Sequence, residues 1–152
     1  MEVFIVNRQD KVELNESIFR SIKDAIRESL ILEGRSLDYE ISVSFVDNDE
    51  IRELNKNYRN IDSATDVLSF VMEEDDDNLI PIKMLGDIVI SAEMALKQSI
   101  EYNHSLLREI TYLSVHSMFH LLGYDHMQQD EAKIMRNKEK EVMKKLHILK
   151  KG

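Results

Sequence analysis

The chain carries two kinds of hydrophobic pattern, one that repeats every second residue and one with a helical period. Ile41, Val43 and Phe45 alternate with more polar residues, which predicts a strand with one buried face. Between residues 17 and 32 the apolar residues are three or four apart, which predicts a helix that Gly34 ends. In the order β-α-β-α-β-β-α-α-α, the patterns predict strands at 2–7, 39–46, 66–71 and 87–91, and helices at 17–32, 51–58, 91–102, from 105 onward, and 130–146. We therefore expect an α+β fold with a small mixed four-stranded sheet covered by about five helices.

The length and composition favour a single domain. The chain has 152 residues, of which 43% are hydrophobic, and this is enough to form one core. It contains no internal repeat and no low-complexity linker. Residues 1–152 are therefore expected to fold as one domain.

The sequence shows no targeting or membrane signal. The first residues contain no basic region followed by a long apolar stretch, and no run approaches the ~20 apolar residues of a membrane span. We expect a soluble, cytoplasmic protein without a membrane partner.

The charge of the chain is unevenly distributed. The net charge is −9, which by itself argues against a general nucleic-acid binder. Residues 133–152, however, hold eight Lys or Arg and two Glu, a local charge of +6, whereas residues 73–77 are all acidic. The overall sign is therefore a poor guide to the local field at a cleft.

The histidine spacing near residue 120 is the strongest chemical signal. From Ile110 to Tyr124 the chain has no Asp, Glu, Lys or Arg, which predicts a helix that is buried nearly all round. His116 and His120 are four residues apart, so their side chains leave the same face. Gly123 can end the helix and turn the chain back, which would bring His126 beside them.

Three imidazoles arranged in this way predict a metal site at the end of a buried helix. The chain has no cysteine, so a transition metal must be bound by His, Asp or Glu. Zinc fits three neutral imidazoles and leaves a fourth position for water, whose pKa it lowers toward about 7. One Zn²⁺ per chain, held by His116, His120 and His126, is therefore expected. Asp125 is a candidate either to accept the outer N–H of a ligand histidine or to bind the catalytic water.

The same spacing occurs in the metzincin metallopeptidases. Those enzymes carry a glutamate directly after the first histidine as the general base, and here that position is Ser117. A serine cannot accept a proton near neutral pH. A metzincin-like peptidase is therefore the weaker alternative.

The chain closely resembles the YbeY family of endoribonucleases, the ribosomal RNA maturation factors. The resemblance covers most of the chain and is strongest at His116-Ser-Met-Phe-His120-Leu-Leu-Gly-Tyr-Asp-His126, at 55–59 with 65–70, at 85–91 and at 101–109. The sequence departs from the family at Ser117, usually glycine, at Phe119, usually leucine, and at Ala64 and Val71, usually proline. None of these departures removes a candidate metal ligand.

The resemblance implies a zinc-dependent endoribonuclease specific for single-stranded RNA. It implies a role in 16S rRNA 3′-end maturation and ribosome quality control, with ribosomal RNA and the small ribosomal subunit as partners. It also implies a positively lined cleft between the histidines and Arg59, with Arg59 and His116 as catalytic residues. A guanidinium can bind two phosphoryl oxygens at once, and Lys56, one helical turn earlier, could extend that contact.

Several points stay open from the sequence. A ribosome-assembly factor without catalytic activity, whose metal is structural, is a further alternative, and a closed fourth metal position would favour it. Another divalent metal also suits imidazole ligands. The nucleophile can be metal-activated water or the 2′-OH of the RNA, and the sequence specifies neither the cleavage position nor the oligomeric state.

Overall fold

The computed structural model describes residues 1–72, 83–124 and 129–147. These residues form four strands and five helices, which confirms the expected α+β class. In chain order they are β1 (Glu2–Asn7), α1 (Glu16–Leu32), β2 (Tyr39–Val46), α2 (Asn48–Arg59), β3 (Val67–Val71), β4 (Lys83–Ser91), α3 (Ala92–Glu101), α4 (Leu106–Leu121) and α5 (Gln129–Lys145).

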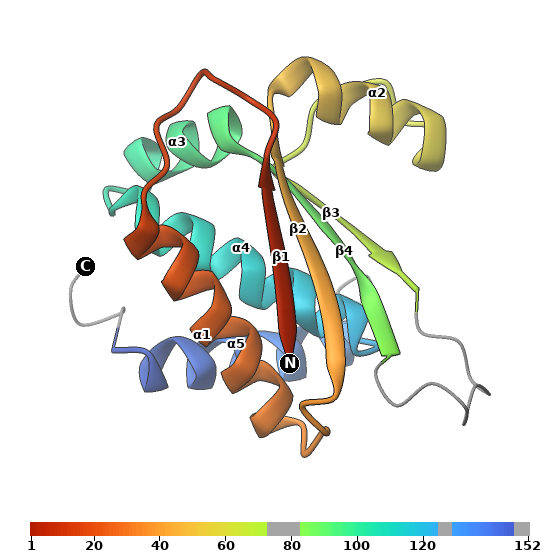
Figure 1. Ribbon diagram of the computed structural model, residues 1–152, viewed down its shortest axis with the longest axis vertical. Coiled ribbons are helices and arrows are strands. Elements are labelled where there is room, and N and C mark those ends of the chain that lie inside the picture. The colour runs from red at the N-terminus through yellow and green to blue at the C-terminus, as the bar shows by residue number, and fades with distance from the viewer. Residues whose placement is uncertain (73–82, 125–128, 148–152) are drawn as a thin grey trace.

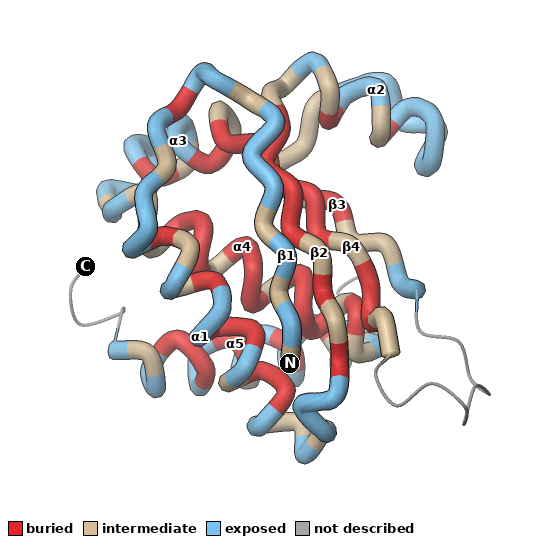
Figure 2. The backbone as a smooth tube through the Cα atoms, viewed as in Figure 1, coloured by how far each residue is buried: buried red, intermediate tan, exposed pale blue. Residues whose placement is uncertain are grey.

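The four strands form one mixed sheet in the order β1-β2-β4-β3 (Figure 1). The pairs β1–β2 and β2–β4 are parallel, whereas β3 runs antiparallel to β4. Helix α1 connects β1 to β2, as a parallel pair requires a crossover. The two central strands, β2 and β4, carry most of the buried positions of the sheet (Figure 2).

Helices cover the two faces of the sheet unequally. Ile88 and Ile90 of β4 belong to the main core, which they form with residues of α1 and α4. Val89, between them, points to the opposite face and packs with Ile51 and Leu54 of α2. Helix α5 packs outside this main layer, against both α1 and α4 (Figure 1). The two helices that carry candidate site residues, α2 and α4, therefore lie on opposite faces of the sheet.

Strand β4 is longer than the expected strand at 87–91, because it begins at Lys83. It pairs on both sides, with Tyr39 of β2 opposite Lys83 and Val71 of β3 opposite Gly86. A Cβ atom on Gly86 would lie 2.4 Å from the Phe70 carbonyl oxygen and 2.7 Å from Leu121 Cδ2. The glycine therefore permits the close approach of the sheet to the last turn of α4.

Capping residues set the helix boundaries. Asn15 and Asp47 cap α1 and α2 by accepting hydrogen bonds from the backbone N–H groups of Ile18 and Glu50. These caps place the starts of α1 and α2 one and three residues before the expected starts at 17 and 51. Helix α2 ends where Asn60 adopts a left-handed conformation with φ 59°.

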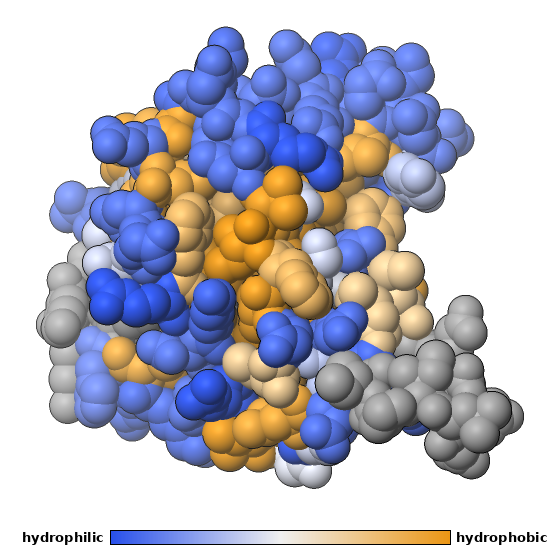
Figure 3. Space-filling model, in the orientation of Figure 1, coloured by the Kyte–Doolittle hydropathy of each residue, from blue (hydrophilic) through white to orange (hydrophobic). Residues whose placement is uncertain are grey.

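A hydrophobic patch lies over β1 at the centre of the face seen in Figure 3. Phe4 and Val6 of this edge strand are each 47% exposed, whereas the alternate residues Val3 and Ile5 pack against the core. Among the described helices, none combines the length and the apolar character that crossing a membrane requires.

Candidate metal centre

Helix α4 presents a narrow unburied stripe on an otherwise buried surface. Between residues 111 and 120, every position is buried except Tyr112, His116 and His120. These three residues follow one another at intervals of four, so they lie on the same side of the helix. The predicted histidine pair therefore lies where the buried helix reaches the surface.

The two imidazoles face each other through their Nε2 atoms. Nε2 of His116 and Nε2 of His120 are 3.2 Å apart, and the ring planes are inclined by 85°. Two nitrogens that bind one zinc tetrahedrally at about 2.05 Å are themselves about 3.3 Å apart. The observed separation therefore fits two ligands of a single tetrahedral ion.

Hydrogen bonds on the other side of each ring determine which nitrogen carries the proton. Nδ1 of His116 donates to a Glu139 carboxylate oxygen at 2.5 Å, and Nδ1 of His120 donates to the Tyr124 carbonyl at 3.0 Å. An ionised carboxylate and a carbonyl can only accept, so both Nδ1 atoms carry hydrogen. In neutral rings this leaves the Nε2 lone pairs directed at each other, an arrangement that a cation between them stabilises.

Glu139 is a site residue that the sequence analysis did not identify. It lies on α5, is only 2% exposed, and uses one oxygen for His116 and the other for the Tyr112 hydroxyl, which donates to it at 3.0 Å. Burial raises the pKa of the Tyr112 phenol, and the Glu139 carboxylate raises it further, so the phenol stays a neutral donor. The signal was present in the sequence: Glu139 is four residues from both Met135 and Met143 on the apolar side of its helix.

The turn after α4 orients His120. Gly123 has φ +103°, and its N–H donates to the His120 carbonyl at 3.0 Å, while the Tyr124 N–H donates to the Phe119 carbonyl at 2.9 Å. The chain therefore reverses after α4, as the position of Gly123 in the sequence predicts, and the reversal brings the Tyr124 carbonyl back to the His120 ring. Tyr124 is anchored in turn by its hydroxyl, which donates to Glu33 at 2.9 Å.

Of the remaining predicted residues, the structure describes only Arg59 and Lys56, and it does not bring them together with this pair. Arg59 and Lys56 are exposed on the last turn of α2, across the sheet from α4. Asp125 and His126 fall within 125–128, outside the described residues. Within the described ranges, no group of three or more His, Cys, Asp or Glu is arranged to hold a metal ion.

The fold and the histidine pair define a small α+β protein whose buried helix presents two imidazoles suited to one divalent cation. The family described as Endoribonuclease YbeY matches residues 4–147. An Endoribonuclease YbeY of Clostridioides difficile strain 630 is 53% identical over 150 residues, covering 97% of this chain and 98% of the relative. The Endoribonuclease YbeY of Finegoldia magna is 50% identical, with 99% of this chain and 97% of the relative covered. The chain belongs to the YbeY endoribonuclease family.

A solved structure shows the same fold. The solution structure of TM1509 from Thermotoga maritima matches with a TM-score of 0.60 and covers 95% of this chain and 91% of its own. The two sequences are 23% identical, so this likeness concerns the fold alone.

Proposed function

We propose that this protein is a zinc-dependent endoribonuclease that cuts single-stranded RNA during 16S rRNA 3′-end maturation and ribosome quality control in the cytoplasm. Its partners are ribosomal RNA and the small ribosomal subunit. The observation that carries the proposal is the histidine pair, whose Nε2 atoms lie 3.2 Å apart while both Nδ1 atoms donate to fixed acceptors. The names of the related proteins, Endoribonuclease YbeY, support the reaction class.

One zinc ion is held by His116, His120 and His126. The first two supply the facing nitrogens, and His126 follows two residues after Tyr124, whose carbonyl oxygen is 3.0 Å from His120 Nδ1. Two residues span at most about 7 Å, which keeps His126 within reach of the pair. When bound, zinc supplies Lewis-acid chemistry, because it stabilises charge on phosphoryl oxygens and activates water at neutral pH. Asp125 is the neighbouring candidate for orienting a ligand or that water.

Arg59 contacts the phosphate to be cleaved, and Lys56 extends that contact along the backbone. Because α2 and α4 lie on opposite faces of the sheet, this contact requires Arg59 to reach the phosphate round the edge strand β3. Both are cations in the last turn of α2, and Arg59 is exposed. A guanidinium binds two phosphoryl oxygens in a fork, which is most valuable when negative charge develops on them.

The surroundings of Ser117 disfavour the peptidase alternative. Ser117, which occupies the position of the peptidase base, is fully buried and its hydroxyl bonds to the Ser69 hydroxyl of β3. No carboxylate stands at that position, so the general base that a metzincin needs is missing. The partly exposed histidine pair likewise favours an open catalytic site over a closed structural one.

Substrate preference tests the proposal directly. The zinc-loaded protein is expected to cut a single-stranded RNA and to cut the duplex of the same sequence much more slowly, because single strands can splay their bases into a cleft whereas an A-form helix cannot. Gel-resolved cleavage of both RNAs, with casein as a peptide control, measures this. Casein cleavage that depends on the metal, without RNA cleavage, would reverse the assignment.

Removal of the Glu139 carboxylate is expected to weaken metal binding. Glu139→Leu leaves His116 Nδ1 without its acceptor, so the ring can turn or change tautomer, and the zinc dissociation constant should rise roughly 10–100-fold. Glu139→Gln should lose less, because its amide oxygen can still accept from Nδ1–H. Competition with a chromogenic chelator measures the constant.

Glu141→Gln provides the control, because Glu141 is exposed on the same helix. If the Glu139→Leu protein kept the parent affinity for zinc, Glu139 would have only a packing role.

A further inference from the structure

A cavity of about 290 Å³ lies between α3, the first half of α4 and the middle of α5. Its volume is close to the lower end of the range of about 300–1,000 Å³ for ligand pockets. We call it the α4–α5 pocket and define it by Tyr102, Arg108, Tyr112, Arg136, Lys140 and Met143. It includes part of the 101–109 motif, which neither the histidine site nor the Arg59 contact uses.

Three cations line the α4–α5 pocket: Arg108 from α4, and Arg136 and Lys140 from α5. Within the described part of the chain, none of the three forms an ion pair. In a protein with a net charge of −9, three unpaired cations around one cavity favour an anionic occupant.

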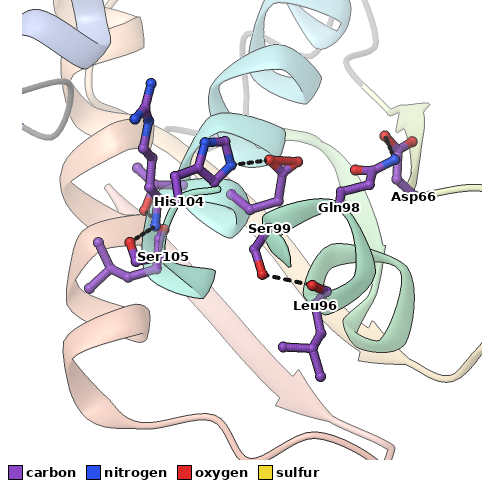
Figure 4. Close-up of polar contacts among 10 residues, drawn as sticks. Asp66, Leu96, Gln98, Ser99, His104 and Ser105 are labelled. Atoms are coloured by element: carbon purple, nitrogen blue, oxygen red, sulfur yellow. Dashed lines mark hydrogen bonds and ion pairs between the residues drawn. The ribbon is translucent and has the colours of Figure 1, made fainter. Parts of the chain in front are cut away.

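The two carboxylates at the pocket are bound to other groups. Glu109 is 3% exposed and contacts His104, with 2.7 Å between its Oε1 and the ring Nε2. Figure 4 shows this contact at His104, directly before the cap of α4. Glu139 is bound by His116 and Tyr112, as described above. The cations therefore remain available to a ligand, although two acidic residues lie beside them.

The remaining walls suit a flat ring. Tyr102, at the end of α3, is 62% exposed, and Tyr112 and Met143 contribute further apolar surface. Aromatic rings of this kind bind unpaired bases by stacking, whatever the base. Cations beside aromatic walls match the two parts of a nucleotide, its phosphate and its base.

The pocket adjoins the candidate metal centre. Tyr112 lines the pocket, and its ring stacks on that of His116 with 6.0 Å between the centroids. A stacked strand rises about 3.4 Å per nucleotide, so the Tyr112 wall of the pocket lies from the His116 ring at a distance comparable to one or two stacked nucleotides. A strand cut at the histidines can therefore place a neighbouring nucleotide in the pocket.

We infer that the α4–α5 pocket is a nucleotide subsite that binds the single-stranded RNA one or two nucleotides from the cleavage point. The phosphate lies on Arg108, Arg136 and Lys140, and the base stacks against Tyr102 and Tyr112. This inference rests on the proposed endoribonuclease function and adds a second contact region to it, separate from Arg59.

Charge removal on α5 tests the phosphate contact. The test protein is Arg136→Ala/Lys140→Ala, and its control is Lys23→Ala/Arg27→Ala on α1. Each variant removes one Lys and one Arg that are exposed and four residues apart. Binding of a fully 2′-O-methylated single-stranded RNA, checked on a gel to stay intact, is followed by fluorescence anisotropy at several salt concentrations. The pocket variant should bind roughly tenfold more weakly for each lost contact. The slope of log K against log salt should fall by about 1.4, because each phosphate contact to a single strand contributes about 0.7.

The outcomes separate the subsite from the function. If the parent protein cuts RNA and the two double variants bind RNA equally, the subsite is refuted while the function stands. If the parent protein cuts no RNA, the function itself fails. Weaker binding and a smaller slope in the pocket variant alone support the subsite.

A single abasic nucleotide tests the stacking contact. In the parent protein, an abasic residue one or two positions from the cleavage point should weaken binding about fivefold or more, because it removes one stacked base. In the Tyr102→Ala protein the same change should have little further effect. In the Ile100→Ala protein, which loses an apolar side chain of α3 that is 72% exposed against 62% for Tyr102, the penalty should persist. An equal abasic penalty in all three proteins would exclude Tyr102 as the base contact.

Discussion

His120→Ala is expected to abolish zinc binding, whereas the parent protein should carry close to one zinc ion per chain. The variant removes one of the two nitrogens that face each other at 3.2 Å. Loss of a direct ligand should lower affinity by more than the roughly 10–100-fold that outer contacts contribute. His120 is a better target than His116, because removal of His116 would also leave the buried Glu139 without one of its two partners. Elemental analysis of protein purified without added metal measures the occupancy, and RNA cleavage should fall with it.

His147 supplies the matched control for this experiment. It is exposed beyond the end of α5 and has a left-handed backbone with φ 61°, so asparagine, which tolerates that conformation, is the suitable replacement. His147→Asn should keep its zinc. Full zinc retention in the His120→Ala protein would refute the proposed metal centre.

Arg59→Ala is expected to lower the rate of RNA cleavage by about 10²–10³ while zinc content and thermal melting stay unchanged. A donor that stabilises developing charge on phosphoryl oxygens typically contributes an effect of this size. Arg59 cannot be a metal ligand, because a guanidinium has no acceptor lone pair. Its exposed position on α2, across the sheet from α4, also separates it from the folding core. Zinc content, melting temperature and cleavage rate are measured on the same preparations.

Further substitutions at this position distinguish a forked contact from a simple charge. Arg59→Lys should restore activity only in part, since an ammonium cannot bind two oxygens in the same geometry. Arg59→Glu should be less active than Arg59→Ala because it repels the phosphate. Arg27→Ala, which removes an exposed arginine of α1, is the control and should cleave normally. Unchanged cleavage by Arg59→Ala would move the phosphate contact to Lys56 or to the cations of α5.

Local sequence patterns were enough to predict most helices and strands, and the His116–His120 pair of the metal centre. Alternation within 39–46 and helical spacing within 17–32 were enough to predict β2 and α1, because each pattern records which side of an element is apolar. The interval of four between His116 and His120 was enough to place both rings on one face of the helix. Gly123 was enough to predict the reversal after α4. These features depend on residues close together in the chain, so local rules describe them. His126, Asp125 and the roles of Arg59 and Lys56 stay predictions.

The tertiary structure decided everything that depends on which elements meet. An apolar face does not specify its partner, so the strand order and the position of α2 across the sheet from α4 could not be read from periodicity. Glu139 contacts His116 across 23 positions of sequence, and Ser69 contacts Ser117 across 48. In the sequence Glu139 is one acidic residue in a basic helix. The packing of α5 against α4 buries it beside His116. Burial and long-range pairing thus assigned the acceptor that orients the metal ligand, because a carboxylate takes that role only where the fold excludes water and supplies the donor.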